Sequence, residues 1–272
     1  MKYTVQSGKY AFKNFIYLLP FAILPAWFLS LATDQEAIKC ALDAIFHGNI
    51  NDFHFVHIFR AISILSFSDV YSIIFGIAAV IFTIVCGAMV MAFLDKHMRI
   101  GKRTFTGIFS KLNDNFVSTA GFVLLLLAMY ELWALLVSTF VYVVSLIPVV
   151  WLAYILACGC YLFMHVVLIY AVGKIYLWLP CMQITGFKAF EALHYSQYLM
   201  STMRWKLLLS QLGILFFVEA LIALCALTPV TWLFTLLTTV FYVLVIIIFC
   251  VRMMVAYFDR DQIERADLRR YY

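Results

Sequence analysis

Six long apolar stretches restrict what this chain can fold into. A helix needs about 20 mostly apolar residues to cross the hydrocarbon core of a bilayer, and stretches of that length recur from end to end. With 66% hydrophobic and 12% charged residues, the chain has far too much apolar surface for a water-soluble fold. The sequence predicts an all-α integral membrane six-helix bundle, with residues 1–272 as a single transmembrane domain. The expected spans lie near residues 12–32, 70–94, 116–145, 149–178, 207–227 and 230–256.

The boundary between the third and fourth spans depends on a proline. From Phe116 to Cys181 the only formal charges are Glu131 and Lys174, so charge does not mark a break. Pro148 cannot donate a backbone hydrogen bond inside a helix and is typical of a chain reversal. The alternative count is five spans, one of them long and oblique.

The distribution of basic residues favours six spans. Cytoplasmic flanks of membrane helices collect Lys and Arg, and six spans put 17 of the 19 basic residues on one side, leaving Lys39 and Arg60 on the other. We therefore expect a multi-pass protein of the cell membrane with both termini in the cytoplasm. This orientation also explains the net charge of +5 without a nucleic-acid partner.

Two predicted outer turns have nearly the same sequence. Residues 146–152 and 227–233 share five of seven residues, 81 positions apart, which suggests a duplicated helical hairpin. Each odd-numbered span also follows a polar flank. The second flank, near residues 102–116, has apolar residues at helical spacing, as in helices that lie along a membrane surface. We expect three repeats of flank helix plus hairpin; the alternative is chance similarity between two proline turns.

This arrangement resembles bacterial membrane proteins related to the glycerophosphodiester phosphodiesterase membrane domain. The resemblance is architectural, covers the whole chain and brings over no site residue. It implies a location in the bacterial cytoplasmic membrane.

Two acidic residues, Glu131 and Glu219, lie inside predicted spans. A carboxylate in hydrocarbon is costly, so such a residue usually faces the bundle interior or a wet cavity. One interpretation is a proton or cation site. The other, which we favour, is a structural carboxyl that ties helices together through neighbours such as Tyr130 or Gln211.

Several basic residues near the inner ends of the later spans are candidates for contact with lipid headgroups. They are Lys174, Arg252, Arg204 and Lys206. Long basic side chains can extend from a span to the headgroups, and a selective clamp on a lipid phosphate is the alternative. Membrane lipids are the expected partners, another membrane protein is a further one, and no cofactor is expected.

The outer segment 33–69 is an amphipathic polar insertion, in which Thr33 and Glu36 have the spacing of a capping box. It contains residue types that bind zinc, namely His47, Asp52, His54 and His57. Apolar residues between them favour an interfacial segment that merely includes histidines, so we expect no metal. The small residues 158–160, which precede His165, are more typical of close helix packing than of a ligand set.

No Gly-rich phosphate loop and no hydrolase or zinc-protease motif occurs in the sequence, and we assign no catalytic residue. We interpret the chain as a non-enzymatic membrane module that binds lipid or a partner protein. One alternative is a small proton- or ion-coupled transporter that uses the two glutamates. The other is a membrane-surface lipid-modifying enzyme with its site among His47, Asp52, His54 and His57.

Overall fold

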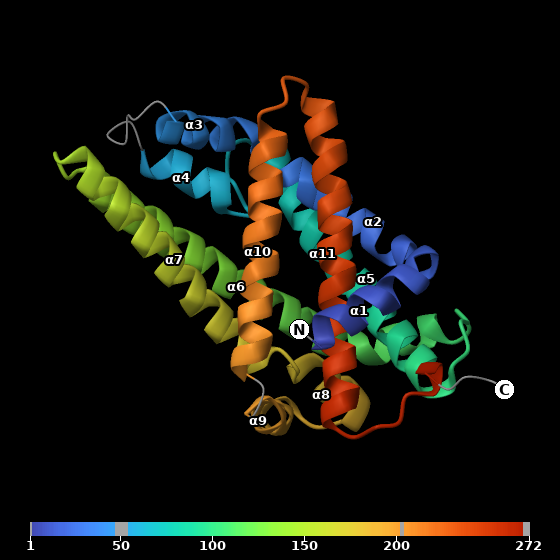
Figure 1. Cartoon of the computed structure of the whole chain (residues 1–272). Coiled ribbons are helices and arrows are strands. Elements are labelled where there is room, and N and C mark those ends of the chain that lie inside the picture. Colours follow the sequence, from blue (N-terminus) through green and yellow to red (C-terminus); the bar gives the residue numbers. More distant parts are fainter. Residues whose placement is uncertain (1, 47–53, 202–203, 269–272) are drawn as a thin grey trace.

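Six long helices form the body of the protein in a computed structural model, which describes residues 2–46, 54–201 and 204–268 (Figure 1). They are α2 (Phe15–Ala32), α5 (Val70–Ile100), α6 (Ile108–Ser145), α7 (Val150–Ile175), α10 (Arg204–Ala226) and α11 (Thr231–Arg260). Each is long and apolar enough to cross a membrane. In the described ranges the regular structure is entirely helical. The prediction of an all-α membrane bundle with six spans is confirmed.

Shorter helices gather at the two ends of the bundle (Figure 1). They are α1 (Lys2–Lys13), α3 (Gln35–Phe46), α4 (Phe55–Ile62), α8 (Trp178–Thr185), α9 (Ala189–Met200) and the 3-10 helix η2 (Ala266–Leu268). We call the end with α8 and α9 the inner end and the end with α3 and α4 the outer end. Hydrogen bonds from Tyr3 to Asp259 and between Tyr10 and His97 hold α1 against α11 and α5.

The core lies where α2 packs against α5 and α11. Its largest buried side chains include Phe93, Tyr176 and Tyr257. Toward the outer end, the hairpin of α6 and α7 leans away from the hairpin of α10 and α11 (Figure 1). Helices α3 and α4 lie between the two hairpins and contact both.

A carboxylate fixes α3 to α4. One oxygen of Asp34 accepts the backbone N–H of Ala37 at 3.0 Å, and the other lies 2.6 Å from the guanidinium of Arg60. The sequence placed this cap at Thr33, but the Thr33 hydroxyl bonds to the carbonyl of Leu29 in α2 at 2.9 Å. Asp34 serves better because its two oxygens can cap a helix and neutralise a cation together.

The second flank does not form a separate surface helix. Residues 108–116 continue directly into α6, because neither Gly nor Pro interrupts the chain there. The 38 residues of α6 make a helix about 57 Å long at about 1.5 Å per residue. That length exceeds the hydrocarbon core of about 30 Å, so α6 must tilt or extend beyond it. Only the first and third flanks, α1 and α9, are distinct helices.

Pro148 and Pro229 lie in turns of the same backbone geometry, at residues 146–149 and 227–230. In each turn the first two residues donate their N–H groups to carbonyls three residues earlier. A valine in an extended conformation then precedes the next helix. The sequence match therefore corresponds to a structural match, and duplication of the hairpin stays a prediction.

Candidate functional site

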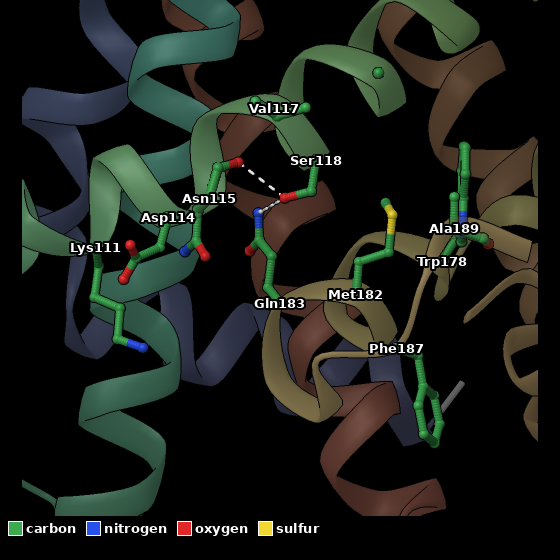
Figure 2. Close-up of a pocket in the computed structure, with 11 residues that line it drawn as sticks. Lys111, Asp114, Asn115, Val117, Ser118, Trp178, Met182, Gln183, Phe187 and Ala189 are labelled. Carbon is green, nitrogen blue, oxygen red and sulfur yellow. Dashed lines mark hydrogen bonds between the residues drawn. The ribbon is translucent and has the colours of Figure 1, made fainter. Parts of the chain in front are cut away.

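A groove of about 500 Å³ opens at the inner end between α6 and α8. Its lining residues are Lys111, Asp114, Asn115, Val117, Ser118, Gly121, Trp178, Met182, Gln183, Phe187 and Ala189. Charged and amide side chains lie toward one end, and Met182, Trp178 and Phe187 lie toward the other (Figure 2). The groove therefore has a polar end and an apolar end.

Hydrogen bonds between α8 and α6 fix the middle of the groove. The side-chain amide of Gln183 donates to the hydroxyl of Thr119 at 2.8 Å and to that of Ser118 at 3.3 Å. Both hydroxyls donate in turn to the backbone carbonyl of Asn115, at 2.8 and 2.9 Å (Figure 2 shows the Ser118 bonds). A ligand would thus meet a groove whose polar groups are already positioned, which lowers the entropic cost of binding.

A second groove, of about 330 Å³, adjoins the first on the side of α5. Lys111, Asn115 and Gln183 line both, so the two grooves are parts of one site.

The cations of this double groove differ in how they are paired. Arg99 lies 2.5 Å from Asp95 and is neutralised by it. The ammonium group of Lys96 donates to the hydroxyl of Thr106 at 2.9 Å. Lys111 is exposed and makes no ion pair within the described part of the chain. Lys111 is therefore the cation best able to accept an anionic ligand.

Aromatic rings form the apolar end of the groove. The indole N–H of Trp178 donates to the carbonyl of Ala189 at 2.8 Å, so this side chain offers mainly its ring to a ligand. Phe187 is 40% exposed. Aromatic rings beside polar groups are typical of the headgroup level of a membrane.

Three of the basic residues singled out from the sequence, Lys174, Lys206 and Arg252, do not line the groove. Lys174 is exposed, and its ammonium lies 4.9 Å from the centre of the Tyr170 ring. Lys206 is exposed as well. Arg204 begins α10, but its side chain lies outside what the structure describes. The sequence missed Lys111 and Gln183, because only packing brings these distant residues together.

Arg252 is wholly buried, so the expectation that it extends to the headgroups is not met. Its guanidinium donates to the side-chain oxygen of Gln211 and to the carbonyl of Leu207, both at 2.7 Å, and also to the hydroxyl of Ser210. Within the described residues no carboxylate pairs with it. Polar groups on two turns of α10 hold this cation inside the bundle.

Glu131 joins α6 to the chain that follows α4. One carboxylate oxygen accepts the backbone N–H groups of Ile64 and Leu65, at 2.9 and 3.1 Å. The other accepts the hydroxyl of Ser63 at 2.6 Å. Tyr130, which the sequence named as a neighbour, bonds to the last carbonyl of α4 at 2.7 Å. The carboxylate acts as a clamp, since all its partners are fixed donors of one turn.

Glu219 joins α10 to α7. Its carboxylate accepts the hydroxyl of Tyr161 at 2.8 Å, and its other oxygen lies 3.0 Å from Nε2 of His165. The rings of Trp133 and Phe216 surround this histidine, at centroid distances of 4.6 and 4.7 Å. Tyr161 and His165 are four residues apart and share one face of α7. That spacing was the available sequence signal for this cluster.

The outer histidines are only partly described. His54 and His57 are exposed, with ring centres 5.8 Å apart, whereas His47 and Asp52 lie outside the described residues. Within the described ranges no group of three or more His, Cys, Asp or Glu side chains is placed to hold a metal ion.

No protein-family model, curated protein or solved structure matches the chain. The fold and the sites on their own define the class: a multi-pass helical membrane protein with a polar and aromatic groove at one end of its bundle.

Proposed function

We propose that the chain is a non-enzymatic membrane module that binds a phospholipid in the inner groove, with the headgroup phosphate beside Lys111. The groove itself carries the proposal, because it combines an unpaired cation, fixed amide groups and aromatic rings in one place.

The surroundings of the groove support a lipid ligand. Phe109 at the start of α6 and Phe190 of α9, which follows the lining residue Ala189, are 74% and 81% exposed. Large apolar side chains beside basic ones are typical of helices at the boundary between headgroups and acyl chains. A groove among such helices faces the headgroup layer, where phospholipids are the most abundant molecules.

The charges of the groove suggest how a headgroup lies in it. Lys111 and Asp114 are one helical turn apart and carry opposite charges (Figure 2). A phosphate can pair with Lys111 while a headgroup ammonium approaches Asp114, as a phosphoethanolamine group allows. A headgroup without an ammonium would use Lys111 alone. The acyl chains would then leave over Trp178 and Phe187.

The proposal includes a location and an origin for the chain. We place the inner end at the cytoplasmic face of a bacterial cell membrane, with both termini in the cytoplasm, in keeping with the basic asymmetry of the sequence. Relation to the glycerophosphodiester phosphodiesterase membrane-domain family is also part of the proposal and rests on architecture. The matching turns at Pro148 and Pro229 support the duplication of a hairpin.

Binding of short-chain phospholipids to the delipidated, purified protein tests the proposal. One basic contact at a membrane surface is worth about 1 kcal/mol, so Lys111→Ala should weaken binding about five-fold. The matched control is Lys102→Ala, an exposed lysine at the same end that lines neither groove. Asp114→Asn should weaken the binding of phosphatidylethanolamine and leave the binding of phosphatidylglycerol unchanged. Equal affinities of the Lys111 and Lys102 variants would refute phosphate binding in the groove.

A further inference from the structure

A second polar site lies within the bundle, between α7 and α10 and apart from the groove. Its members are His165 and Tyr161 of α7 and Glu219 of α10. The side chain of His165 is wholly buried, whereas that of Glu219 is 26% exposed. An ionisable pair in this position requires its charges and hydrogen bonds to balance, because the surrounding medium screens them poorly.

The hydrogen bonds of His165 determine how many protons the pair holds. Nδ1 lies 3.0 Å from the backbone carbonyl oxygen of Tyr161, which can only accept, so Nδ1 carries a hydrogen. Nε2 lies 3.0 Å from Oε1 of Glu219. With Nδ1 protonated, this second contact is a hydrogen bond only if one further proton lies on Nε2 or on the carboxyl group.

Without that further proton, one of the two contacts must fail. If Nδ1 keeps its hydrogen, the lone pair of Nε2 faces an ionised carboxylate. If the hydrogen moves to Nε2, the lone pair of Nδ1 faces the carbonyl of Tyr161. The protonated pair avoids both repulsions and is neutral overall, whether it is imidazolium with carboxylate or imidazole with carboxylic acid.

We propose that His165 and Glu219 together form an intramembrane proton-binding site, and that its one exchangeable proton holds α7 against α10. Release of the proton leaves a net negative charge within the bundle and breaks the contact between Nε2 and Oε1. Glu219 is the partly exposed member of the pair. This proposal does not depend on lipid binding in the groove.

The neighbouring titratable groups do not replace either partner. Tyr161 donates its hydroxyl to the second oxygen of Glu219 at 2.8 Å, a bond that does not use the shared proton. Tyr130 and Glu131 of α6 and Tyr242 of α11 belong to the same electrostatic neighbourhood. The carboxylate of Glu131 is occupied by the three donors that follow α4, and the Tyr242 hydroxyl bonds to Thr33 at 2.9 Å.

The decisive variant is Glu219→Gln. Its amide oxygen can accept from Tyr161 and its amide nitrogen can donate to Nε2 of a neutral His165, so both hydrogen bonds survive without the carboxylate. A proton added to the imidazole would then be a buried charge with no counter-charge, which is unfavourable. The control is Glu131→Gln, which changes the other carboxyl inside a span without touching the pair. Both variants are studied as the full chain in lipid nanodiscs.

Proton uptake and thermal stability are measured as the pH is varied over the range in which His and Glu titrate. The wild type should take up one proton per chain at this site, and its stability should fall as rising pH removes the proton. The Glu219→Gln variant should lose both the uptake and this pH dependence, and the Glu131→Gln variant should keep them. Uptake that persists in Glu219→Gln, or disappears in Glu131→Gln, overturns the proposal.

Nitrogen-15 NMR of the His165 ring gives a test that needs no substitution at the pair. On the acid side Nδ1 should carry a hydrogen and Nε2 should be hydrogen-bonded, and rising pH should change both signals in a single transition. The proposal is overturned if Nδ1 carries no hydrogen on the acid side, or if the ring signals do not change with pH. This test holds even if the variants fail to fold.

Discussion

Replacement of Glu131 by leucine should destabilise the protein strongly, because it removes the acceptor of three hydrogen bonds at once. The stranded donors are the hydroxyl of Ser63 and the backbone N–H groups of Ile64 and Leu65. Ser63 is buried and the other two residues are half-buried. An unsatisfied donor costs about 1–3 kcal/mol when buried, so the low end of that range gives about 3 kcal/mol for the three.

Glutamine at the same position is the matched control. Its side-chain oxygen can still accept both backbone N–H groups, and its amide nitrogen can donate to the oxygen of Ser63. The free energy of unfolding should therefore change by less than about 1 kcal/mol.

Thermal unfolding in detergent gives the overall effect, and hydrogen exchange at the amides of Ile64 and Leu65 gives the local one. In the leucine variant these two amides should exchange faster and the unfolding temperature should fall. The proposed role of Glu131 as a clamp would be refuted if the leucine variant were as stable as the wild type. It would also be refuted if the glutamine variant were as unstable as the leucine variant.

Three further predictions concern other parts of the molecule. Arg252→Ala should cost about 2–4 kcal/mol in thermal unfolding, since it leaves a cavity and strands acceptors on α10; unchanged stability would contradict the buried role. The hydrogen bond to Asp261 raises the pKa of Tyr195 to about 12, so the stability that this bond contributes should be lost as pH rises from about 10 toward that value. Asp261→Asn should lower this pKa in a tyrosinate absorbance titration. Reporter fusions should place residues 1, 105, 195 and 265 in the cytoplasm and residue 45 outside; a periplasmic signal at 105 or 195 would contradict the topology.

The spans and the proline turns could be predicted because they depend on local sequence. Span length follows from apolar stretches, and Pro148 and Pro229, each between two such stretches, mark the turns that separate them. The second flank shows the limit of such patterns. Apolar residues at helical spacing predict a helix, but they do not distinguish a separate surface helix from the first turns of α6.

The site residues could be predicted only in part, because their roles depend on which helices meet. Glu131 and Glu219 stand out as carboxyls within spans, yet their partners lie on other elements of the chain. The position of Arg252 near the inner end of a span predicts a side chain that extends to the headgroups. Acceptors on α10 instead keep its guanidinium inside the bundle. Nothing in the sequence around Lys111 reveals that α8 will form a groove beside it.

Photocrosslinking tests the central claim, that a phospholipid occupies the inner groove, most directly. A phosphatidylethanolamine analogue with a photoactivatable group near its headgroup is reconstituted with the full chain, and the labelled peptides are identified by mass spectrometry. We expect adducts concentrated in residues 111–121 and 178–189, where α6 and α8 line the groove, and much weaker labelling there in Lys111→Ala. Labelling spread evenly over the lipid-facing helices, or unchanged by that substitution, would contradict the claim.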